Sequence, residues 1–504
     1  MTSAALLSPL AADPADADSA AAAALGALRA GREEEGLALL EQARAHHPND
    51  ARLWQIGGLL HRKLDDLEPA VAAFAKAAVL APGNALIAHG HARAALEAGL
   101  PAIDLFERAR ALAPSDGSVL LGLAAARFAE LGPDSAIEGV EAQLRANPGW
   151  LPGHALAARL HHMAGRADAF TLSYERALAA APASADLWRE LVSVLIQAER
   201  HEEALAAIAR ARSAVGDQPA FVLSEAICQD ELGHAGIAAR LFASLPRGGD
   251  VHLAIHRIRH LLRSGRPAEA AEVAEPISGG PEANLVWPYL SLAWRLLGDP
   301  RWDWLEGDES LVGVYDLSDS LPPLDALAGR LRALHVATAQ PLEQSVRGGT
   351  QTDGHLFARI DPEIRQLRSA VVAAVERHVA SLPAIDPAHP TLRHRRDTRV
   401  SFSGSWSVRL TGAGHHANHI HSAGWLSSAL YVALPDEAQR GPPPAGWLTL
   451  GEPQSELGLD LPPFRTIEPR PGRLVLFPST MWHGTRPFEA GERLTVAFDV
   501  ARPA

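Results

Sequence analysis

The chain has 504 residues, of which 21% are charged, and a formal net charge of -13 at neutral pH. Its Lys and Arg residues form no basic block, so the composition excludes an electrostatic surface for nucleic acid or for an anionic membrane. The single cysteine, Cys228, excludes an intramolecular disulfide and a zinc site built on thiolates. The N-terminus lacks the basic and apolar segments of a signal peptide, and no apolar run is long enough to cross a membrane. We expect a cytoplasmic protein with no nucleic-acid or membrane partner and with a disordered tail over residues 1–18.

Prolines recur in the first half of the chain in similar contexts and at a nearly constant spacing. They lie in HHPND, LAPGN, LAPSD, ANPGW and AAPAS, with successive separations of 34, 32, 34 and 34 residues. A period near 34 in an alanine-rich sequence is typical of tetratricopeptide repeats, in which each helix pair buries its apolar face on its neighbours. The segment 51–84 resembles that family at Trp54, Gly58, Ala70, Phe74, Ala77 and Pro82. The resemblance predicts an all-α repeat array over residues 19–275.

Tetratricopeptide arrays usually bind a peptide or a protein in their concave groove. The resemblance therefore implies a protein or peptide partner, and a spacer or dimerisation element is the alternative. The alanine-rich pattern stops close to residue 297. We expect a helical linker or docking segment over residues 276–320, followed by a second domain over residues 321–504.

The hydrophobic period of the chain changes from that of a helix to that of a strand after the segment IDPAHP. The last long helix that we expect is DPEIRQLRSAVVAAVERHVASL, with Asp361 as its N-cap. Five strand-like segments follow between Gly and Pro turns: TRVSFSGSWSVRL, WLSSALYVALP, GWLTLGEP, GRLVLFPS and ERLTVAFDV. So many short strands predict a sandwich or a jelly-roll barrel.

Four histidines lie just before one of these strands, in GAGHHANHIHSAGWLSSALYV, at positions 415, 416, 419 and 421. An H-x-H spacing is weak evidence by itself, because 23 histidines in 504 residues produce about one by chance. In an extended chain, however, residues two apart share a face, so His419 and His421 can bind one ion together. His483 follows a strand and a turn 62 residues after His421 and is a candidate third ligand.

The final strand-like segment places a cation and a hydroxyl on the same face. With a period of two, Arg493 and Thr495 face one way, and the apolar residues 494, 496 and 498 face the other. A buried arginine needs an anionic partner, and a carboxylate of a ligand can accept two hydrogen bonds from its guanidinium group. This face is therefore a candidate binding site for a carboxylate.

Together these residues resemble the 2-oxoglutarate/Fe(II) dioxygenases of the prolyl-hydroxylase-like superfamily. The stretches RGGTQTDGHLF, SWSVRL, HIHSAGWLSSALYV and LFPSTMWHGTRPF are similar to a bacterial family of 2OG-Fe(II) oxygenases, whose members often carry tetratricopeptide repeats before the barrel. The resemblance runs from about residue 324 to residue 499. It implies a multidomain chain, in which the repeat solenoid precedes a double-stranded β-helix, or jelly-roll, with flanking helices.

The resemblance also implies the roles of the site residues. His419, His421 and His483 would hold Fe(II) and leave positions open for the cosubstrate and for O2. The residues implied to contact 2-oxoglutarate are Arg493, Thr495, Tyr431, Ser427 and Arg409. For Arg409 a structural ion pair is the alternative, and no catalytic side chain beyond the metal site is implied.

His421 departs from the superfamily pattern, which usually has an aspartate at this position. A neutral imidazole can bind Fe(II), but it removes one negative charge from the site. The sequence leaves three alternatives open for this site: a metal with three protein ligands, a metal with two protein ligands and His421 turned away, or no metal. Three-histidine iron sites also occur in thiol dioxygenases, which use no 2-oxoglutarate, although Arg493 argues against that assignment.

We expect oxidative decarboxylation of 2-oxoglutarate to succinate and CO2, coupled to hydroxylation of a C–H bond in a protein or peptide recruited by the array. A small-molecule substrate is an alternative, with the repeats used for assembly. A non-catalytic repeat scaffold with a degenerate oxygenase barrel is a second alternative, from a different class of protein.

Overall fold

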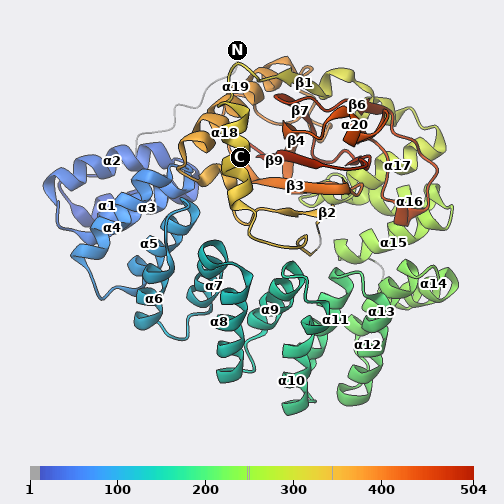
Figure 1. Cartoon of the computed structure of the whole chain (residues 1–504), viewed down its shortest axis with the longest axis horizontal. Helices are drawn as coiled ribbons and strands as arrows, with labels where there is room; N and C mark the ends of the chain where they lie inside the picture. Colours follow the sequence, from blue (N-terminus) through green and yellow to red (C-terminus); the bar gives the residue numbers. More distant parts are fainter. Residues whose placement is uncertain (1–11, 247, 249, 343, 504) are drawn as a thin grey trace. The chain divides into compact units, whose positions relative to one another are not determined.

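The computed structural model describes residues 12–246, 248, 250–342 and 344–503 (Figure 1). Contacts between Cα atoms divide these residues into two compact units. The first comprises residues up to 136 together with 353–368, and the second comprises 137–352 and 369–503. The second unit therefore contains both the later helices of the repeat region and most of the C-terminal β region.

The first unit is built from helices joined by short turns. These helices are α1 (Ala17–Ala30), α2 (Glu33–His46), α3 (Ala51–Lys63), α4 (Leu67–Leu80), α5 (Ala85–Glu97), α6 (Ile103–Leu112) and α7 (Gly117–Leu131), and α8 (Pro133–Ala146) follows them. Gly58 of α3 and Phe74 of α4 show why the repeat pattern needs a small residue. A Cβ atom at Gly58 would lie 2.6 Å from the Phe74 ring, so only glycine lets the two helices pack at this distance.

The predicted disordered tail, residues 1–18, lies only partly in the described structure. Residues 1–11 lie outside the described residues. The side chain of Asp16 accepts a hydrogen bond from the Asp18 N–H and caps α1, so Ala17 and Asp18 already belong to this helix.

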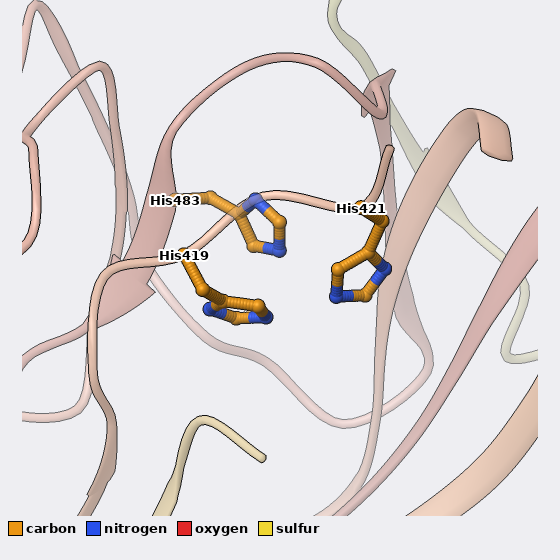
Figure 2. Close-up of side chains that lie close together, drawn as sticks. All are labelled: His419, His421 and His483. Carbon is orange, nitrogen blue, oxygen red and sulfur yellow. The ribbon is translucent and has the colours of Figure 1, made fainter. Parts of the chain in front are cut away.

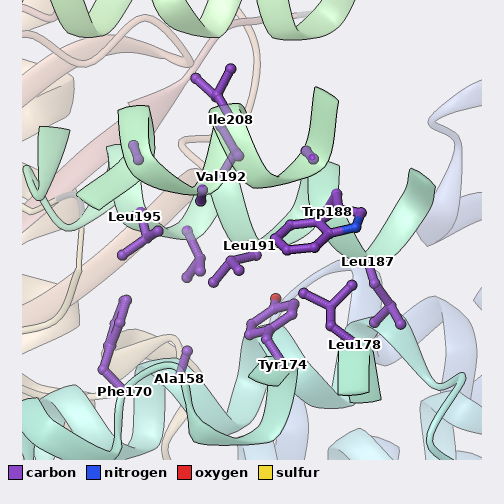
Figure 3. Close-up of a cluster of buried hydrophobic side chains, with 14 of the residues drawn as sticks. Ala158, Phe170, Tyr174, Leu178, Leu187, Trp188, Leu191, Val192, Leu195 and Ile208 are labelled. Atoms are coloured by element: carbon purple, nitrogen blue, oxygen red, sulfur yellow. The ribbon is translucent and has the colours of Figure 1, made fainter. Parts of the chain in front are cut away.

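The second unit continues the helical repeats up to the β region. Its helices are α9 (Leu151–Met163), α10 (Leu172–Ala180), α11 (Ala185–Gln197), α12 (His201–Val215), α13 (Pro219–Glu231), α14 (Ala235–Ser244), α15 (Val251–Arg263), α16 (Pro267–Ala274) and α17 (Trp287–Leu297). Figure 3 shows the apolar cluster that the first of these helices share, with Tyr174, Leu191 and Trp188 near its centre. These helices thus pack as pairs that share apolar faces, as the repeat pattern predicts.

A recurring hydrogen bond confirms the sequence period at the atomic level. The Trp54 and Trp188 indoles donate to the carbonyl oxygens of Pro48 and Pro182, each six residues earlier and each at 2.9 Å. In the repeat directly before that of Trp188, a ring nitrogen of His154 lies 2.9 Å from the Pro148 carbonyl oxygen. The carbonyl oxygen of the equivalent proline is therefore bound in three repeats, twice by a tryptophan and once by a histidine.

The segment 276–320, predicted as a helical linker, contributes to the packing of the second unit. Helix α17 buries Leu290 and Trp294 in a cluster with α15 and α16. Strand β1 (Gly313–Asp316) pairs antiparallel with β7 (Arg473–Pro478) at the edge of the larger sheet. The segment therefore supplies both a core helix and an edge strand.

The β region consists of two antiparallel sheets, and its connecting segments carry three helices. The remaining strands are β2 (Val346–Gln351), β3 (Phe402–His416), β4 (Gly424–Ala433), β5 (Leu448–Leu450), β6 (Arg465–Ile467), β8 (His483–Thr485) and β9 (Glu492–Ala501), and the helices are α18 (Leu324–Leu334), α19 (Pro362–Ser381) and α20 (Glu437–Arg440). The strand orders are β1-β7-β4-β9-β3-β2 and β6-β5-β8. Tyr431, Leu450 and Phe477 belong to one buried cluster drawn from both sheets. The predicted class, helical repeats followed by an antiparallel β region, is confirmed.

All five predicted strands are present, and the strands that the sequence did not reveal are short. Strands β1, β6 and β8 have three or four residues, and β2 has the sequence VRGGTQ, with two glycines and one buried residue. Such segments lack the apolar alternation on which strand prediction depends. Helix α19 begins directly after Asp361, as predicted. Within the described ranges, none of the helices combines the length and apolar composition needed to cross a bilayer.

Glu306 is a buried carboxyl group in the π-helical turn Asp303–Gly307 that follows α17. Ser291 Oγ donates a hydrogen bond to its Oε2 at 2.7 Å, and Trp302 Nε1 donates to the same oxygen at 3.3 Å. Burial raises the pKa of Glu306 from 4.5 to about 7, and the hydrogen bonds oppose this rise. The folded chain therefore retains a proton that the unfolded chain releases at lower pH.

This raised pKa predicts that the Glu306→Gln substitution stabilises the protein in alkaline solution. Protonated Glu306 favours the folded state, and this contribution is lost as the pH rises through the folded pKa of about 7. The difference between the two pKa values corresponds to roughly 3 kcal/mol. Urea unfolding should show a higher midpoint for Glu306→Gln than for wild type at about pH 8.5, and little difference at about pH 5. Glu309→Gln, at an exposed position nearby, is the control, and equal midpoints for wild type and Glu306→Gln at both pH values would contradict the prediction.

Candidate metal centre

Backbone pairing places the three predicted histidine ligands next to one another. His419 and His421 lie in the extended segment between β3 and β4, and His483 begins β8. His419 and His483 form an antiparallel bridge, in which each backbone N–H donates to the carbonyl oxygen of the other at 2.9 and 3.0 Å. The His421 N–H donates to the Ser479 carbonyl oxygen at 2.9 Å. The two chain segments are thus held in register by main-chain hydrogen bonds.

The apolar neighbours of these histidines determine which way the imidazoles point. Ile420 and Trp482 both pack into the apolar cluster of α15, α16 and α17. The Trp482 indole donates to the Pro288 carbonyl oxygen at 3.0 Å and meets the Tyr289 ring edge-on, with 5.7 Å between ring centroids. Because alternate residues of an extended chain face opposite sides, this anchoring turns the adjacent histidines away from the helices.

The three imidazoles converge, and one nitrogen atom of each lies within 4.8 Å of the others (Figure 2). Their Nδ1 atoms are already occupied. His419 Nδ1–H donates to the Ala417 carbonyl oxygen at 2.8 Å, and His483 Nδ1–H donates to the Met481 carbonyl oxygen at 3.0 Å. Since a carbonyl oxygen can only accept, these contacts assign the proton to Nδ1 and leave the Nε2 lone pair free for a metal ion.

Burial keeps two of these rings in the neutral form that binds metals. It lowers the pKa of His419 to about 3, with the neighbouring His421 adding to the effect. Burial also lowers the pKa of His483 well below its ordinary value, and His419 contributes further. Neither imidazole therefore needs to lose a proton before it binds a metal ion near neutral pH.

Asp499 is a residue of this site that the sequence analysis left without a role. Its two carboxylate oxygens accept from His421 Nδ1 at 2.7 and 2.8 Å. Its position in the sequence could have revealed this role. Asp499 lies four residues after Thr495 on β9, so it shares the face of Arg493 and Thr495 and must point towards the same interior. Ser427, implied as a contact of 2-oxoglutarate, instead donates to Asp499 Oδ1 at 2.6 Å. Ser427 therefore supports Asp499 in this structure.

A second polar group of the pocket, Arg493, is buried without an anionic partner. Its side chain is almost fully enclosed, Nη1 donates to the Gly446 carbonyl oxygen at 3.1 Å, and Nε has no hydrogen-bond partner. The Tyr431 ring lies under the guanidinium group, 5.1 Å from its carbon to the ring centroid, and the Tyr431 hydroxyl also lacks a partner. Burial lowers the pKa of Arg493 and raises the pKa of Tyr431. Buried donors of this kind are normally satisfied, so they indicate a place for an acceptor.

The histidines and Arg493 line one pocket. Its wall also includes Trp406, Leu448, Phe477, Thr495 and Ala497. Arg493, Thr495 and Ala497 face the pocket together, as the alternation of β9 predicts. The structure thus places the candidate metal ligands and the candidate carboxylate-binding arginine in the same enclosed space.

Arg409, also implied as a contact of the cosubstrate, lies on the opposite face of β3. Its Nε donates to Glu492 Oε2 at 2.5 Å, while its neighbours Val408 and Leu410 are buried in the β core. The strand alternation that turns these two apolar residues inward turns Arg409 outward. Arg409 thus forms the ion pair that was the alternative to a cosubstrate contact, and it is not among the residues that line the pocket.

Polar residues that were not singled out as ligands or cosubstrate contacts also line the pocket. His416, at the end of β3, lines the pocket, and Ser345 Oγ lies 3.0 Å from its Nδ1. Gln344 and Ser345 come from the segment before β2 and also line the pocket. The neighbouring His415 is not among the lining residues and lies at the surface, with Nδ1 3.4 Å from the Ala413 carbonyl oxygen.

Comparison with known proteins connects this region with a family. Residues 404–499 match the family described as "Putative 2OG-Fe(II) oxygenase". This span contains all three histidines, Asp499 and Arg493. No curated protein matches the chain.

Several solved structures are similar to parts of the chain. MamA from Desulfovibrio magneticus RS-1 is 20% identical over 33% of this chain and 94% of that chain, with a TM-score of 0.29. A tetratricopeptide repeat protein from Parabacteroides merdae is 14% identical over 45% of this chain and 90% of that chain, with a TM-score of 0.29. Yeast Tom70 is 14% identical over 56% of this chain and 61% of that chain, with a TM-score of 0.36.

The converging Nε2 atoms predict that divalent metal binding depends on His483. Replacing it with alanine removes one of three donors and should weaken Co(II) binding by at least about tenfold, measured by direct anaerobic titration. His415→Ala is the matched control, because it removes a histidine close in sequence that lies outside the pocket. Co(II) binding by His483→Ala with the affinity of wild type would exclude the three-histidine site.

Proposed function

We propose that the region similar to 2OG-Fe(II) oxygenases is the catalytic part of an Fe(II)- and 2-oxoglutarate-dependent dioxygenase that hydroxylates a C–H bond. The observation that carries this proposal is Arg493, a buried guanidinium with a free N–H, in the same pocket as three convergent histidines. A dicarboxylate that binds a metal at one end and a guanidinium at the other fits both groups. 2-Oxoglutarate is such a molecule.

The donor set fits Fe(II). Imidazole nitrogen is a suitable ligand for this ion, and three ligands on one side leave positions for a cosubstrate and for O2. When bound, Fe(II) would supply the oxidation chemistry, in which 2-oxoglutarate is converted to succinate and CO2 while one oxygen atom enters the substrate. The chain's own contribution is to hold the His419, His421 and His483 rings with one nitrogen atom of each facing a single point.

Arg493 would seat the carboxylate of 2-oxoglutarate that lies away from the metal. Its Nε–H and Nη–H groups can donate to both oxygen atoms of one carboxylate, and such charge-assisted pairs are strong inside a protein. Thr495, two residues further on the same face, and the unpartnered Tyr431 hydroxyl are available for additional hydrogen bonds. These contacts would fix the cosubstrate in one orientation.

The apolar part of the wall would exclude water from the reacting atoms. Trp406, Leu448 and Phe477 enclose the pocket between the two sheets. Hydrogen bonds and charge interactions are stronger in such a water-poor space than at a surface. Gln344, which lines the pocket and is exposed to solvent, marks the side from which a substrate would enter.

Thiol dioxygenation is the rival reaction that the three histidines alone would allow. It requires no 2-oxoglutarate, and it would leave the Arg493 guanidinium buried without an anion. The unpaired arginine is what favours the 2-oxoglutarate reaction. A non-catalytic scaffold would need neither the shared Nδ1–H assignment nor the free Nε2 atoms.

A protein or peptide recruited through the repeat array is the substrate class that we propose. The support is the covalent link between helical repeats and the oxygenase region in one chain. Lysate proteins should gain one oxygen atom in the presence of Fe(II), 2-oxoglutarate and the full chain, but not with His483→Ala, as measured by mass spectrometry. Oxygen incorporation confined to the small-molecule fraction would assign a metabolite as the substrate instead.

The proposed reaction is tested most directly by anaerobic titration of the full chain with Fe(II) and then 2-oxoglutarate. Joint binding should produce a metal-to-ligand charge-transfer band in the visible spectrum, and added O2 should yield succinate. A protein that binds Fe(II) but develops no band and forms no succinate would contradict the proposal. Thiol-dependent O2 consumption without 2-oxoglutarate would favour the rival reaction.

The two arginines implied as cosubstrate contacts predict opposite results on substitution. Arg493→Ala removes a buried charge-assisted contact and should cost about 2–5 kcal/mol of 2-oxoglutarate binding, so the KM should rise well over tenfold. Arg409→Ala removes an ion pair on the outer face of β3 and should leave the KM within about twofold. Succinate formation at varied 2-oxoglutarate concentration measures both values. Equal effects of the two substitutions would contradict the assignment of Arg493.

A further inference from the structure

The three imidazoles of the candidate metal centre differ in the group that holds their Nδ1 proton. His419 and His483 each donate to a backbone carbonyl oxygen, which carries only a partial charge. His421 donates to the carboxylate of Asp499. One ring of the three is therefore coupled directly to a full negative charge.

Asp499 occupies a position built for a carboxylate. The residue is 7% exposed, and Ser427 Oγ donates to its Oδ1 at 2.6 Å. Ser427 Oγ also lies 3.0 Å from Ser479 Oγ, and the Ser479 carbonyl oxygen accepts from the His421 backbone N–H. A buried charge is costly unless hydrogen bonds satisfy it, and here the donors are the His421 ring and Ser427. The same small network thus fixes both the backbone and the side chain of His421.

We propose that Asp499 is a positioning residue that supplies, through His421, the negative charge that the three-histidine centre lacks. This inference rests on the proposed function, because it assumes that a divalent ion binds at the three Nε2 atoms. The hydrogen bond fixes the tautomer and plane of His421 and leaves Nε2 available. A carboxylate at this place also makes Nε2 a stronger electron donor towards a bound metal ion.

This arrangement accounts for a histidine at the position where 2-oxoglutarate oxygenases usually carry an aspartate. With an aspartate ligand, the negative charge contacts the metal directly. Here the charge lies one imidazole further away, on β9, and reaches the metal through the ring. A carboxylate, histidine and metal in series is a general means of orienting a ligand and adjusting its affinity.

Two substitutions at position 499 separate the effect of charge from the effect of geometry. Asp499→Asn keeps an oxygen that can accept from His421 Nδ1 but removes the charge, and Asp499→Ala removes both. Outer partners of metal ligands commonly contribute ten- to hundredfold in metal affinity. Co(II) affinity should therefore fall by about ten- to hundredfold in Asp499→Ala and by a smaller factor in Asp499→Asn.

Glu492→Gln is the matched control, because it removes one carboxylate from the same strand. Glu492 lies at the other end of β9, where it accepts from Arg332 and Arg409, and it is not among the residues that line the pocket. Its substitution should leave Co(II) affinity within about twofold. Circular dichroism of all three variants checks that each remains folded.

A second measurement does not require metal. In the metal-free protein, ¹⁵N spectra of the histidine rings should show His421 protonated at Nδ1 in wild type and in Asp499→Asn, and a mixture of tautomers in Asp499→Ala. An unchanged His421 spectrum and unchanged Co(II) affinity in Asp499→Ala would overturn the role of Asp499. A wild-type protein that shows the tautomer but binds no Co(II) would instead overturn the proposed metal centre.

Discussion

The candidate site depends on one constraint, the anchoring of two apolar side chains that alternate with the histidines. Ile420 lies between His419 and His421, and Trp482 directly precedes His483. Both apolar residues are held in the helical cluster around α17. Because an extended chain cannot turn two consecutive side chains to the same side, packing on one side determines where the imidazoles point on the other. Hydrophobic burial, which has no directional preference of its own, here gives direction to polar ligands.

Strand β9 carries two buried charges of opposite sign on one face. Arg493 and Asp499 are six residues apart, which in a strand corresponds to about 20 Å, too far for an ion pair. Each charge must therefore find another partner. Asp499 has His421 and Ser427, whereas Arg493 keeps an unpaired N–H. At one end of the strand, the buried charge of Asp499 is paired by residues of the chain. At the other end, the buried charge of Arg493 can still accept an anion as a partner.

Much of this architecture could be predicted from the sequence, because it depends on local periodicity. The proline spacing of the repeats, the inward face of Arg493 and Thr495, and the proximity of His419 and His421 all follow from fixed helical or strand periods. The partners of Ser427 and Arg409 could not be obtained in this way. Both side chains were assigned by family resemblance, and both make contacts with residues far away in the sequence.

Asp499 and α17 also make contacts with residues far away in the sequence, which the sequence did not reveal. The hydrogen bond from His421 to Asp499 joins residues 78 positions apart, and the one from Trp482 to Pro288 joins residues 194 positions apart. Neither of these sequence separations follows from a helical or strand period. A composition change near residue 297 marks the end of the alanine-rich pattern, but it contains no information on whether the last helix packs against the β region.

The contact between Trp482 and α17 connects the last helices of the repeat region to a candidate metal ligand. A helix pair could be gained or lost in the middle of such an array while each remaining pair still packs on a neighbour. At the α15–α17 end, the same event would leave the Trp482 indole without Pro288 and Tyr289, next to a metal ligand. In evolution, and in the engineering of hybrid enzymes, this terminal segment should therefore be inherited together with the oxygenase.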